Sequence, residues 1–145
     1  MEYTIYRPNK KQTGGAMGFN LHKDRKFSFV KAAPQIAPMG EKPLFGWMEE
    51  SINLKLELVD VGQILAVFAG TEDEANLFHK TSDTENKVFN IKHVPEKRGY
   101  SVKLSQKRGG EVKSVSIGIA YGEAQIFEEY LRMVTRENLK AAGQQ

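Results

Sequence analysis

Apolar and polar side chains alternate along most of the chain, and this pattern predicts a protein built mainly from β-strands. In residues 51–58, the apolar residues Ile52, Leu54, Leu56 and Leu58 are separated by polar ones. Such alternation is typical of a strand with one buried and one exposed face. We expect further strands where the same alternation is found, at residues 1–7, 19–23, 26–30, 75–80, 87–92, 100–105 and 114–119.

Turn-forming residues separate these segments. Asp24 and Arg25 fit a tight connection between two strands, and the prolines of residues 34–43 exclude a central strand there. Because glycine accepts positive φ values, turns are also expected at Gly14, Gly15, Gly99, Gly109 and Gly110.

Two segments follow helical spacing instead. Residues 61–69 place apolar side chains on several sides of a helix, with Asp60 as its expected N-cap and Gly70 as its stop. A second, longer helix is predicted near the C-terminus from the apolar stripe formed by Ile126, Phe127, Tyr130, Leu131 and Val134.

The two halves of the chain repeat the same order of elements. Residues 19–21 (Phe-Asn-Leu) recur as residues 89–91 (Phe-Asn-Ile), and each half ends with a strand that leads into a helix containing Gln-Ile. Strands followed by a helix, twice over, predict an α+β fold in which antiparallel sheets pack against two helices. We expect an N-terminal strand and flexible basic segment at 1–16, one domain at 17–140 and a disordered tail at 141–145.

Composition narrows the class of protein. The 145 residues are 40% hydrophobic and 27% charged, which is typical of a globular chain, and there is no cysteine. Disulfides, iron–sulfur clusters and thiolate chemistry are therefore excluded. The N-terminus lacks the apolar core of a signal peptide, and the longest apolar stretch, 64–69, is too short to cross a bilayer. We expect a cytoplasmic, nucleoid-associated protein.

Charge is distributed in blocks although the net charge is only +3. Residues 1–31 carry seven Lys or Arg and two acids, 49–74 carry one base and seven acids, and 87–113 carry eight bases and two acids. Two basic segments flanking an acidic one are typical of a protein with one surface that faces a polyanion, the alternative being chance clustering.

No pattern of catalytic or metal-binding residues is found. His22, His79 and His93 lack the spacing of metal ligands and are interpreted as exposed strand residues. No nucleophile motif, phosphate-binding loop or carboxylate pair is present. We therefore expect a protein that is not an enzyme and needs no metal or cofactor.

Basic and aromatic residues together point to single-stranded nucleic acid. In the strand at 100–105 and just beyond it, Ser101, Lys103, Ser105 and Lys107 share one face, which suits a phosphate track. Aromatic side chains beside cations hold single strands by base stacking. The candidate binding residues are Lys23, Lys26, Lys31, Lys92, Lys103, Ser105 and Lys107 for phosphates, and Phe29, Trp47 and Tyr100 for stacking.

These assignments have structural alternatives. Phe29 is also typical of a core position facing a helix, and Tyr100 fits a core position as well as a stacking one. Trp47 suits a structural role, and lysines on a polar face also serve to solubilise a protein.

Several motifs resemble a known family. They are residues 19–23 (FNLHK), 29–34 (FVKAAP), 45–47 (FGW), 54–64 (LKLELVDVGQI), 70–73 (GTED) and 77–80 (LFHK). In this order they resemble the single-stranded-DNA-binding Whirly proteins and the kinetoplastid mitochondrial guide-RNA-binding proteins. Both belong to the single-stranded-DNA-binding transcriptional regulator superfamily, with human positive cofactor four. The resemblance covers roughly residues 17–139. Gly46 departs from the aspartate of the family motif, and the lysine-rich stretch of the plant first strand has no match.

The resemblance implies two consecutive four-strand-plus-helix repeats and a homotetramer, with a dimer as the alternative, in which the helices meet at the centre. It implies a bound strand that runs over the sheets and between subunits, with weak sequence preference. The expected function is binding of single-stranded DNA in transcription regulation, replication or repair. An RNA-binding or annealing module and an oligomeric protein–protein scaffold remain alternative functions.

Overall fold

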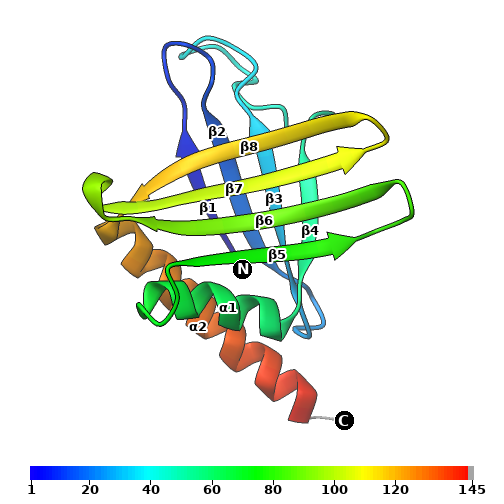
Figure 1. Ribbon diagram of the computed structural model, residues 1–145, viewed down its shortest axis with the longest axis vertical. Helices are drawn as coiled ribbons and strands as arrows, with labels where there is room; N and C mark the ends of the chain where they lie inside the picture. Colours follow the sequence, from blue (N-terminus) through cyan, green and yellow to red (C-terminus); the bar gives the residue numbers. More distant parts are fainter. Residues whose placement is uncertain (144–145) are drawn as a thin grey trace.

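Two four-stranded antiparallel sheets and two helices make up the fold, as shown by a computed structural model that describes residues 1–143 (Figure 1). The first sheet has the order β1-β2-β3-β4, formed by Glu2–Arg7, Gly15–Leu21, Ser28–Pro34 and Ile52–Leu56. The second sheet has the order β5-β6-β7-β8, formed by Glu74–Lys80, Glu85–Val94, Gly99–Arg108 and Glu111–Ala120. Helix α1 (Leu58–Phe68) follows the first sheet, helix α2 (Tyr121–Gly143) follows the second, and a short 3₁₀ turn, η1 (Pro95–Lys97), connects β6 to β7. The predicted fold, two repeats of four strands and a helix, is confirmed.

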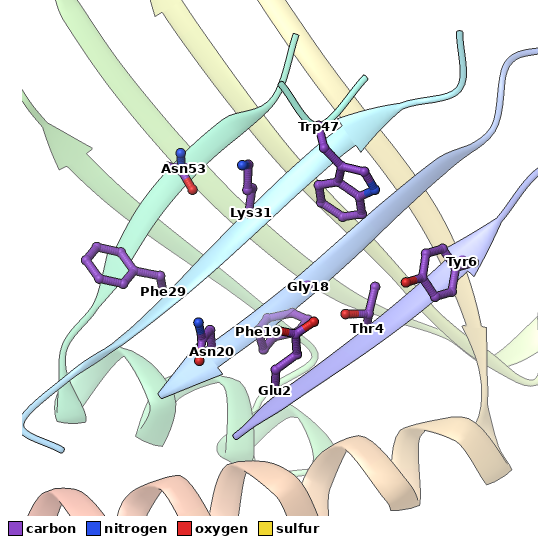
Figure 2. A pocket seen from close by; sticks show the side chains of 10 residues that line it. All are labelled: Glu2, Thr4, Tyr6, Gly18, Phe19, Asn20, Phe29, Lys31, Trp47 and Asn53. Atoms are coloured by element: carbon purple, nitrogen blue, oxygen red, sulfur yellow. The ribbon is translucent and has the colours of Figure 1, made fainter. Parts of the chain in front are cut away.

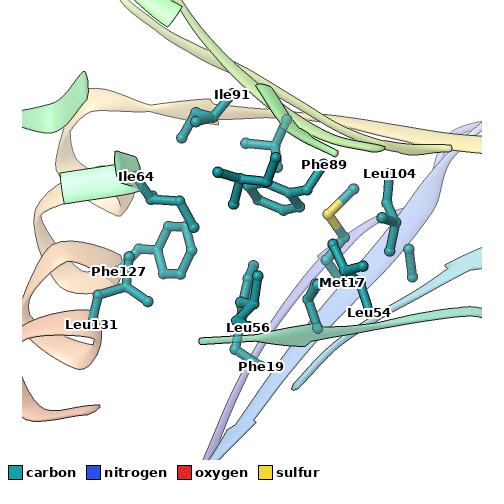
Figure 3. Packing of buried hydrophobic residues seen from close by; sticks show 14 of the residues in the cluster. Met17, Phe19, Leu54, Leu56, Ile64, Phe89, Ile91, Leu104, Phe127 and Leu131 are labelled. Atoms are coloured by element: carbon teal, nitrogen blue, oxygen red, sulfur yellow. The ribbon is translucent and has the colours of Figure 1, made fainter. Parts of the chain in front are cut away.

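The two sheets pack against each other through their apolar faces. Met17 and Phe19 of the first sheet and Phe89 and Leu104 of the second are almost completely buried in one continuous core (Figure 3). Because side chains alternate along a strand, the remaining positions of each sheet point away from this core. We refer to these as the outer faces, and they lie on opposite sides of the molecule.

The helices close the core at one end of the sheets (Figure 1). The ring of Phe127 in α2 lies 4.4 Å from that of Phe19 and 5.6 Å from that of Phe68, the last residue of α1. The Tyr130 hydroxyl donates a hydrogen bond to the Phe19 carbonyl, 3.0 Å away. The helices thus bind the inner faces and leave the outer faces of both sheets open. No helix in residues 1–143 has the length and apolar character needed to span a membrane.

The start of α1 differs from the prediction. The N-cap is Glu57 rather than Asp60, because Asp60 lies one turn into the helix. The Asp60 carboxylate accepts a hydrogen bond of 2.8 Å from the Glu57 backbone N–H, as in a capping box. Gly70 ends the helix as predicted, with a φ of +80°.

Glycines at the predicted turns play two different roles. Gly109 has a φ of +60°, as expected for a turn glycine. Gly14, Gly15, Gly99 and Gly110 do not have positive φ, so the positive φ predicted for them is wrong. A Cβ on Gly99 would collide with the Ile119 carbonyl of the neighbouring strand, and the positive φ of that turn belongs to Arg98.

Residues at both ends of the described range, 1–143, belong to regular structure. Strand β1 pairs with β2 along its whole length, from Glu2 opposite Asn20 to Arg7 opposite Gly15. Helix α2 continues to Gly143, so the tail expected at 141–145 begins inside the helix, and residues 144–145 lie outside the described part.

Candidate nucleic-acid interface

The outer face of the first sheet is covered at one end and open at the other. The connection between β3 and β4 folds over the covered end, where Phe45 packs on Ala16 and Ala33. The buried Gln35 fixes this connection, because its side-chain amide hydrogen-bonds to both backbone groups of Asn9 at 2.8 and 3.0 Å. The open end forms a groove of about 640 Å³ (Figure 2), which we call the first-sheet groove.

A glycine in the middle of a strand forms the floor of the first-sheet groove. Gly18 lies in β2 between Thr4 of β1 and Lys31 of β3. A Cβ at this position would lie 3.2 Å from the Thr4 hydroxyl and 3.9 Å from the Trp47 ring. Glycine inside a strand often marks a close approach by a ligand or another backbone, and here it leaves the space hollow.

Three of the predicted binding residues meet in the first-sheet groove. Figure 2 shows Lys31 between the rings of Phe29 and Trp47. Phe29 is on the outer face, so the core alternative for this residue was wrong. Trp47 packs against the Phe45 cluster, as its structural alternative predicts, and it also lines the groove. Lys31 is half-buried, and within residues 1–143 it forms no ion pair.

Polar residues of the first-sheet groove were missed by the sequence analysis. Asn20 lies between Glu2 and Phe29, and Asn53 lies beside Lys31 on the neighbouring strand. The alternation of the strands places these residues on the outer face. Their convergence depends on the register between strands, which the sequence pattern does not contain.

The outer face of the second sheet carries the predicted basic track. Lys103 and Lys107 lie exposed on β7, with the half-buried Ser105 between them. Lys92 of β6 lies opposite Ser101 in the same face. Within the described chain, neither Lys92, Lys103 nor Lys107 is paired with a carboxylate. The face therefore offers free cations along one strand and its neighbour.

Asn76, Asn90 and Phe78 also lie on this face, and the sequence pattern did not identify them as binding candidates. The Asn90 amide donates to the Glu74 carboxylate at 2.6 Å and to the Asn76 side-chain oxygen at 2.8 Å. Two residues beyond Asn76 on β5, Phe78 lies opposite Val88 on the same face and is 61% exposed. An exposed phenylalanine beside lysines is a stacking candidate, and its place in an alternating strand was its only signal.

Lys23 and Lys26 lie in the β2–β3 turn, next to the end of the first sheet that carries Phe29. The turn is longer than predicted, because β2 ends at Leu21 and β3 begins at Ser28. Within it, Arg25 has a φ of +65°, and its N–H donates to the His22 carbonyl. A backbone hydrogen bond from Lys26 lowers the pKa of the Asp24 carboxyl. The turn is held on α2, where the Asn138 amide donates to the Arg25 carbonyl at 2.7 Å.

Tyr100 is separated from the other candidate residues. It points to the inner face of β7, where its ring lies 4.9 Å from Phe68 in an edge-to-face arrangement. Burial raises the pKa of its hydroxyl. The structure thus places Tyr100 at the border of the core, on the opposite side of the sheet from Lys103.

The candidate residues form two surfaces rather than the single polyanion-facing one that charge blocks suggested. Phe29, Lys31 and Trp47 belong to the outer face of the first sheet, and Lys103 and Lys107 to that of the second. Since the inner faces are packed together, the two outer faces point in opposite directions.

The histidines are not the exposed strand residues that were expected. His93 shares a hydrogen bond of 2.7 Å with the Tyr121 hydroxyl, His79 lies 3.2 Å from the Asp60 carboxylate, and the His22 ring stacks on Phe27. All three are half-buried by these partners. Residues 1–143 contain no group of three or more His, Asp or Glu side chains that could hold a metal ion.

The same fold is found in solved structures of other proteins. No protein-family model matches the sequence, and no curated protein matches it either. Among solved structures, WHY3 from Arabidopsis thaliana is 14% identical with a TM-score of 0.78, covering 99% of this chain and 90% of that one. MRP1/MRP2 from Trypanosoma brucei is 17% identical with a TM-score of 0.76, covering 97% and 87%.

A guide-RNA-binding protein complex bound to a guide RNA is 18% identical with a TM-score of 0.74, covering 95% and 91%. The plant transcriptional regulator PBF-2 gives the same TM-score at 17% identity, covering 97% and 82%. These likenesses extend over nearly the whole chain, and they confirm the resemblance at the level of the fold. The protein therefore has the fold shared by the plant Whirly proteins and the trypanosome guide-RNA-binding proteins.

Proposed function

We propose that this protein binds single-stranded nucleic acid on the outer faces of its two sheets, without catalysing a reaction. The observation that carries the proposal is the first-sheet groove, where Lys31 lies half-buried between Phe29 and Trp47 without a carboxylate partner in residues 1–143. A cation beside partly exposed aromatic rings is the combination that binds a phosphate and stacks a base. Stacking of this kind contributes about 1–3 kcal/mol per base.

The second sheet supplies the electrostatic part of the proposed binding. Lys103 and Lys107 are four residues apart on β7, which corresponds to about 13 Å at ~3.3 Å per residue. A strand that neutralises its phosphates on these ammonium groups releases counterions, so binding weakens as salt increases. We infer that Lys92 and Ser105 belong to the same track, and that Lys23 and Lys26 extend the contact at the first sheet.

Single-stranded DNA is the preferred ligand in this proposal, with weak overall sequence preference and a role in transcription regulation, replication or repair. The fold is that of PBF-2, a plant transcriptional regulator, which favours this choice. RNA is the second candidate, because a guide-RNA-binding complex has the same fold.

A homo-oligomer, a tetramer rather than a dimer, is part of the proposal. Helices α1 and α2 expose apolar side chains on the side away from the core: Val59 is 67%, Ile126 60% and Leu139 55% exposed. Association through the helices would bury these groups and leave the sheets free for the strand. A strand passing between subunits could then use outer faces of opposite orientation.

The test is fluorescence anisotropy with a labelled single strand of about 30 nucleotides, its duplex and the matching RNA, at low and moderate salt. Binding to the single strand that exceeds binding to the duplex and weakens with salt supports the proposal. RNA binding tighter than DNA binding would assign the RNA function instead. Salt-sensitive self-association without oligonucleotide binding would identify a protein scaffold and overturn the proposal.

A further inference from the structure

The first-sheet groove contains a carboxylate that phosphate binding and stacking do not explain. Glu2 lines the groove together with Lys31, and both are charged. We propose, resting on the nucleic-acid function above, that this groove is a base-selective subsite that takes one unstacked guanine of the bound strand. The rest of the strand is held without regard to sequence.

The groove has room for a base. Its volume of about 640 Å³ lies in the range of ~300–1,000 Å³ found for small-ligand sites. The hollow exists because Gly18 has no side chain there, while its neighbours across the sheet, Thr4 and Lys31, do. A flat ring can thus approach the β2 backbone more closely at Gly18 than at positions where a side chain projects.

The aromatic wall is supported by packing and by the backbone before any ligand binds. The Trp47 ring lies 6.5 Å from that of Phe45, which is buried against Ala16 and Ala33. Gly46 between them is fixed to β3 by a backbone hydrogen bond of 2.9 Å to the Pro34 carbonyl. A stacking surface held in place in this way loses little entropy when a base binds.

The state of Glu2 indicates what the base must offer. Glu2 is exposed, and beside a bound strand its carboxylate, which repels phosphate, is favourable where it stays hydrated or accepts hydrogen bonds from a base. In residues 1–143 Glu2 forms no ion pair or side-chain hydrogen bond. Glu74, on the outer face of the other sheet, is engaged by the Asn90 amide at 2.6 Å. Glu2 is therefore free to accept hydrogen bonds from a base, whereas Glu74 already accepts one from Asn90.

Guanine is the base that matches the two charges of the groove. Its N1–H and N2–H₂ groups are adjacent donors that a carboxylate can accept together, and its O6 and N7 are acceptors suited to lysine. Glu2 would take the donors and Lys31 the acceptors. Adenine and cytosine offer a carboxylate one amino group, and thymine presents a single N–H between two carbonyls.

The experiment is competition against a labelled oligothymidine by unlabelled oligothymidines in which one central residue is replaced by dG, dA or dC. We expect the dG oligonucleotide to compete about tenfold better than the others, the order of discrimination of a two-hydrogen-bond base contact. The variant Glu2→Gln should lose this preference while it retains binding to oligothymidine. Glu74→Gln removes the same charge from the other outer face and should keep the preference.

A second pair of variants tests the hollow itself. Gly18→Val should fill the groove and abolish the dG preference, whereas Gly118→Val, at an outer-face position of β8 with open space around it, should not. Thermal unfolding verifies that both variants fold. Equal competition by all four oligonucleotides would overturn the guanine subsite and leave the proposed function intact. Failure of the wild type to bind oligothymidine or any of the competitors would overturn both.

Discussion

Tyr130 shows how one side chain joins the two halves of the repeat. It projects from α2, and its hydroxyl lies 3.0 Å from the Phe19 carbonyl and 3.2 Å from that of Met1, so that it closes the end of the first sheet against the helix. Its ring stacks on Tyr3 at 5.7 Å. Burial raises the pKa of the Tyr130 hydroxyl to about 12, because the charged phenolate would lose water there.

At this scale we predict that Tyr130→Phe lowers the free energy of unfolding by about 1–2 kcal/mol, since the variant loses the hydrogen bond from the half-buried hydroxyl to the Phe19 carbonyl. The raised pKa adds a pH dependence. Tyr130 stabilises the fold fully below pH 10.0, the ordinary tyrosine value, and the contribution is lost as the pH rises towards about 12. Urea unfolding at neutral and alkaline pH measures both effects. Equal free energies of unfolding for the wild type and Tyr130→Phe at neutral pH would contradict the predicted loss of stability.

Helix α1 illustrates how an element is fixed at its first turn. Asp60 is buried, accepts the Glu57 N–H and lies 3.2 Å from the His79 ring on β5. The same carboxylate therefore caps the helix and connects it to the second sheet. The positions of α1 and of the edge strand β5 depend on each other through this group.

We predict that Asp60→Ala destabilises the protein by about 1–2 kcal/mol, because it removes the cap and leaves a backbone N–H at the start of α1 without its partner. Asp60→Asn retains an oxygen acceptor and should lose less. Urea unfolding of the three proteins measures the difference. Oligonucleotide affinity should stay unchanged, and a loss of affinity in a folded Asp60→Ala variant would show that the helix layer takes part in binding.

The whole molecule presents two outer faces of different chemistry. The first carries a groove with aromatic walls, and the second carries lysines and asparagines. Each face has its own part in the proposed binding. Removing lysines from the second sheet should therefore affect oligonucleotide binding differently from filling the first-sheet groove.

We predict that Lys103→Ala combined with Lys107→Ala weakens single-strand binding and reduces the slope of log affinity against log salt by about 1.4, at ~0.7 per phosphate contact. Anisotropy titrations over a salt series measure the slope. Arg136→Ala with Lys140→Ala removes the same charge from the exposed side of α2 and is the control. An unchanged slope and affinity would show that β7 does not carry the phosphate track.

Oligomer formation is tested on the helices. Val59→Glu with Ile126→Glu should shift the sedimentation coefficient towards that of the monomer, because the charges would be desolvated in a helix interface. Both side chains are exposed in the single chain, so the fold itself should tolerate the changes. A wild-type protein that sediments as a monomer at micromolar concentration would contradict the proposed assembly.

The sequence pattern was sufficient to predict the strands, the helices and their repeated order. Alternation and helical spacing show directly which side chains are buried. Lys103, Ser105 and Lys107 were placed on one face for the same reason. Glu2 and Asn20 were missed because they meet through the β1–β2 register, which no single segment encodes. Tyr100 was grouped with the lysines although it is one residue out of phase with Ser101 and Lys103, which is enough to place it on the other side of the sheet.

The opposite orientation of the two outer faces also determines the path of a long ligand. A strand that occupied both could not remain extended, and would have to turn around a sheet edge or pass to a neighbouring subunit. Turning around a sheet edge would draw the two ends of the strand together as the protein bound. Dyes on the ends of an oligonucleotide would then report binding as increased energy transfer, and a protein of this kind would compact single strands as it protects them.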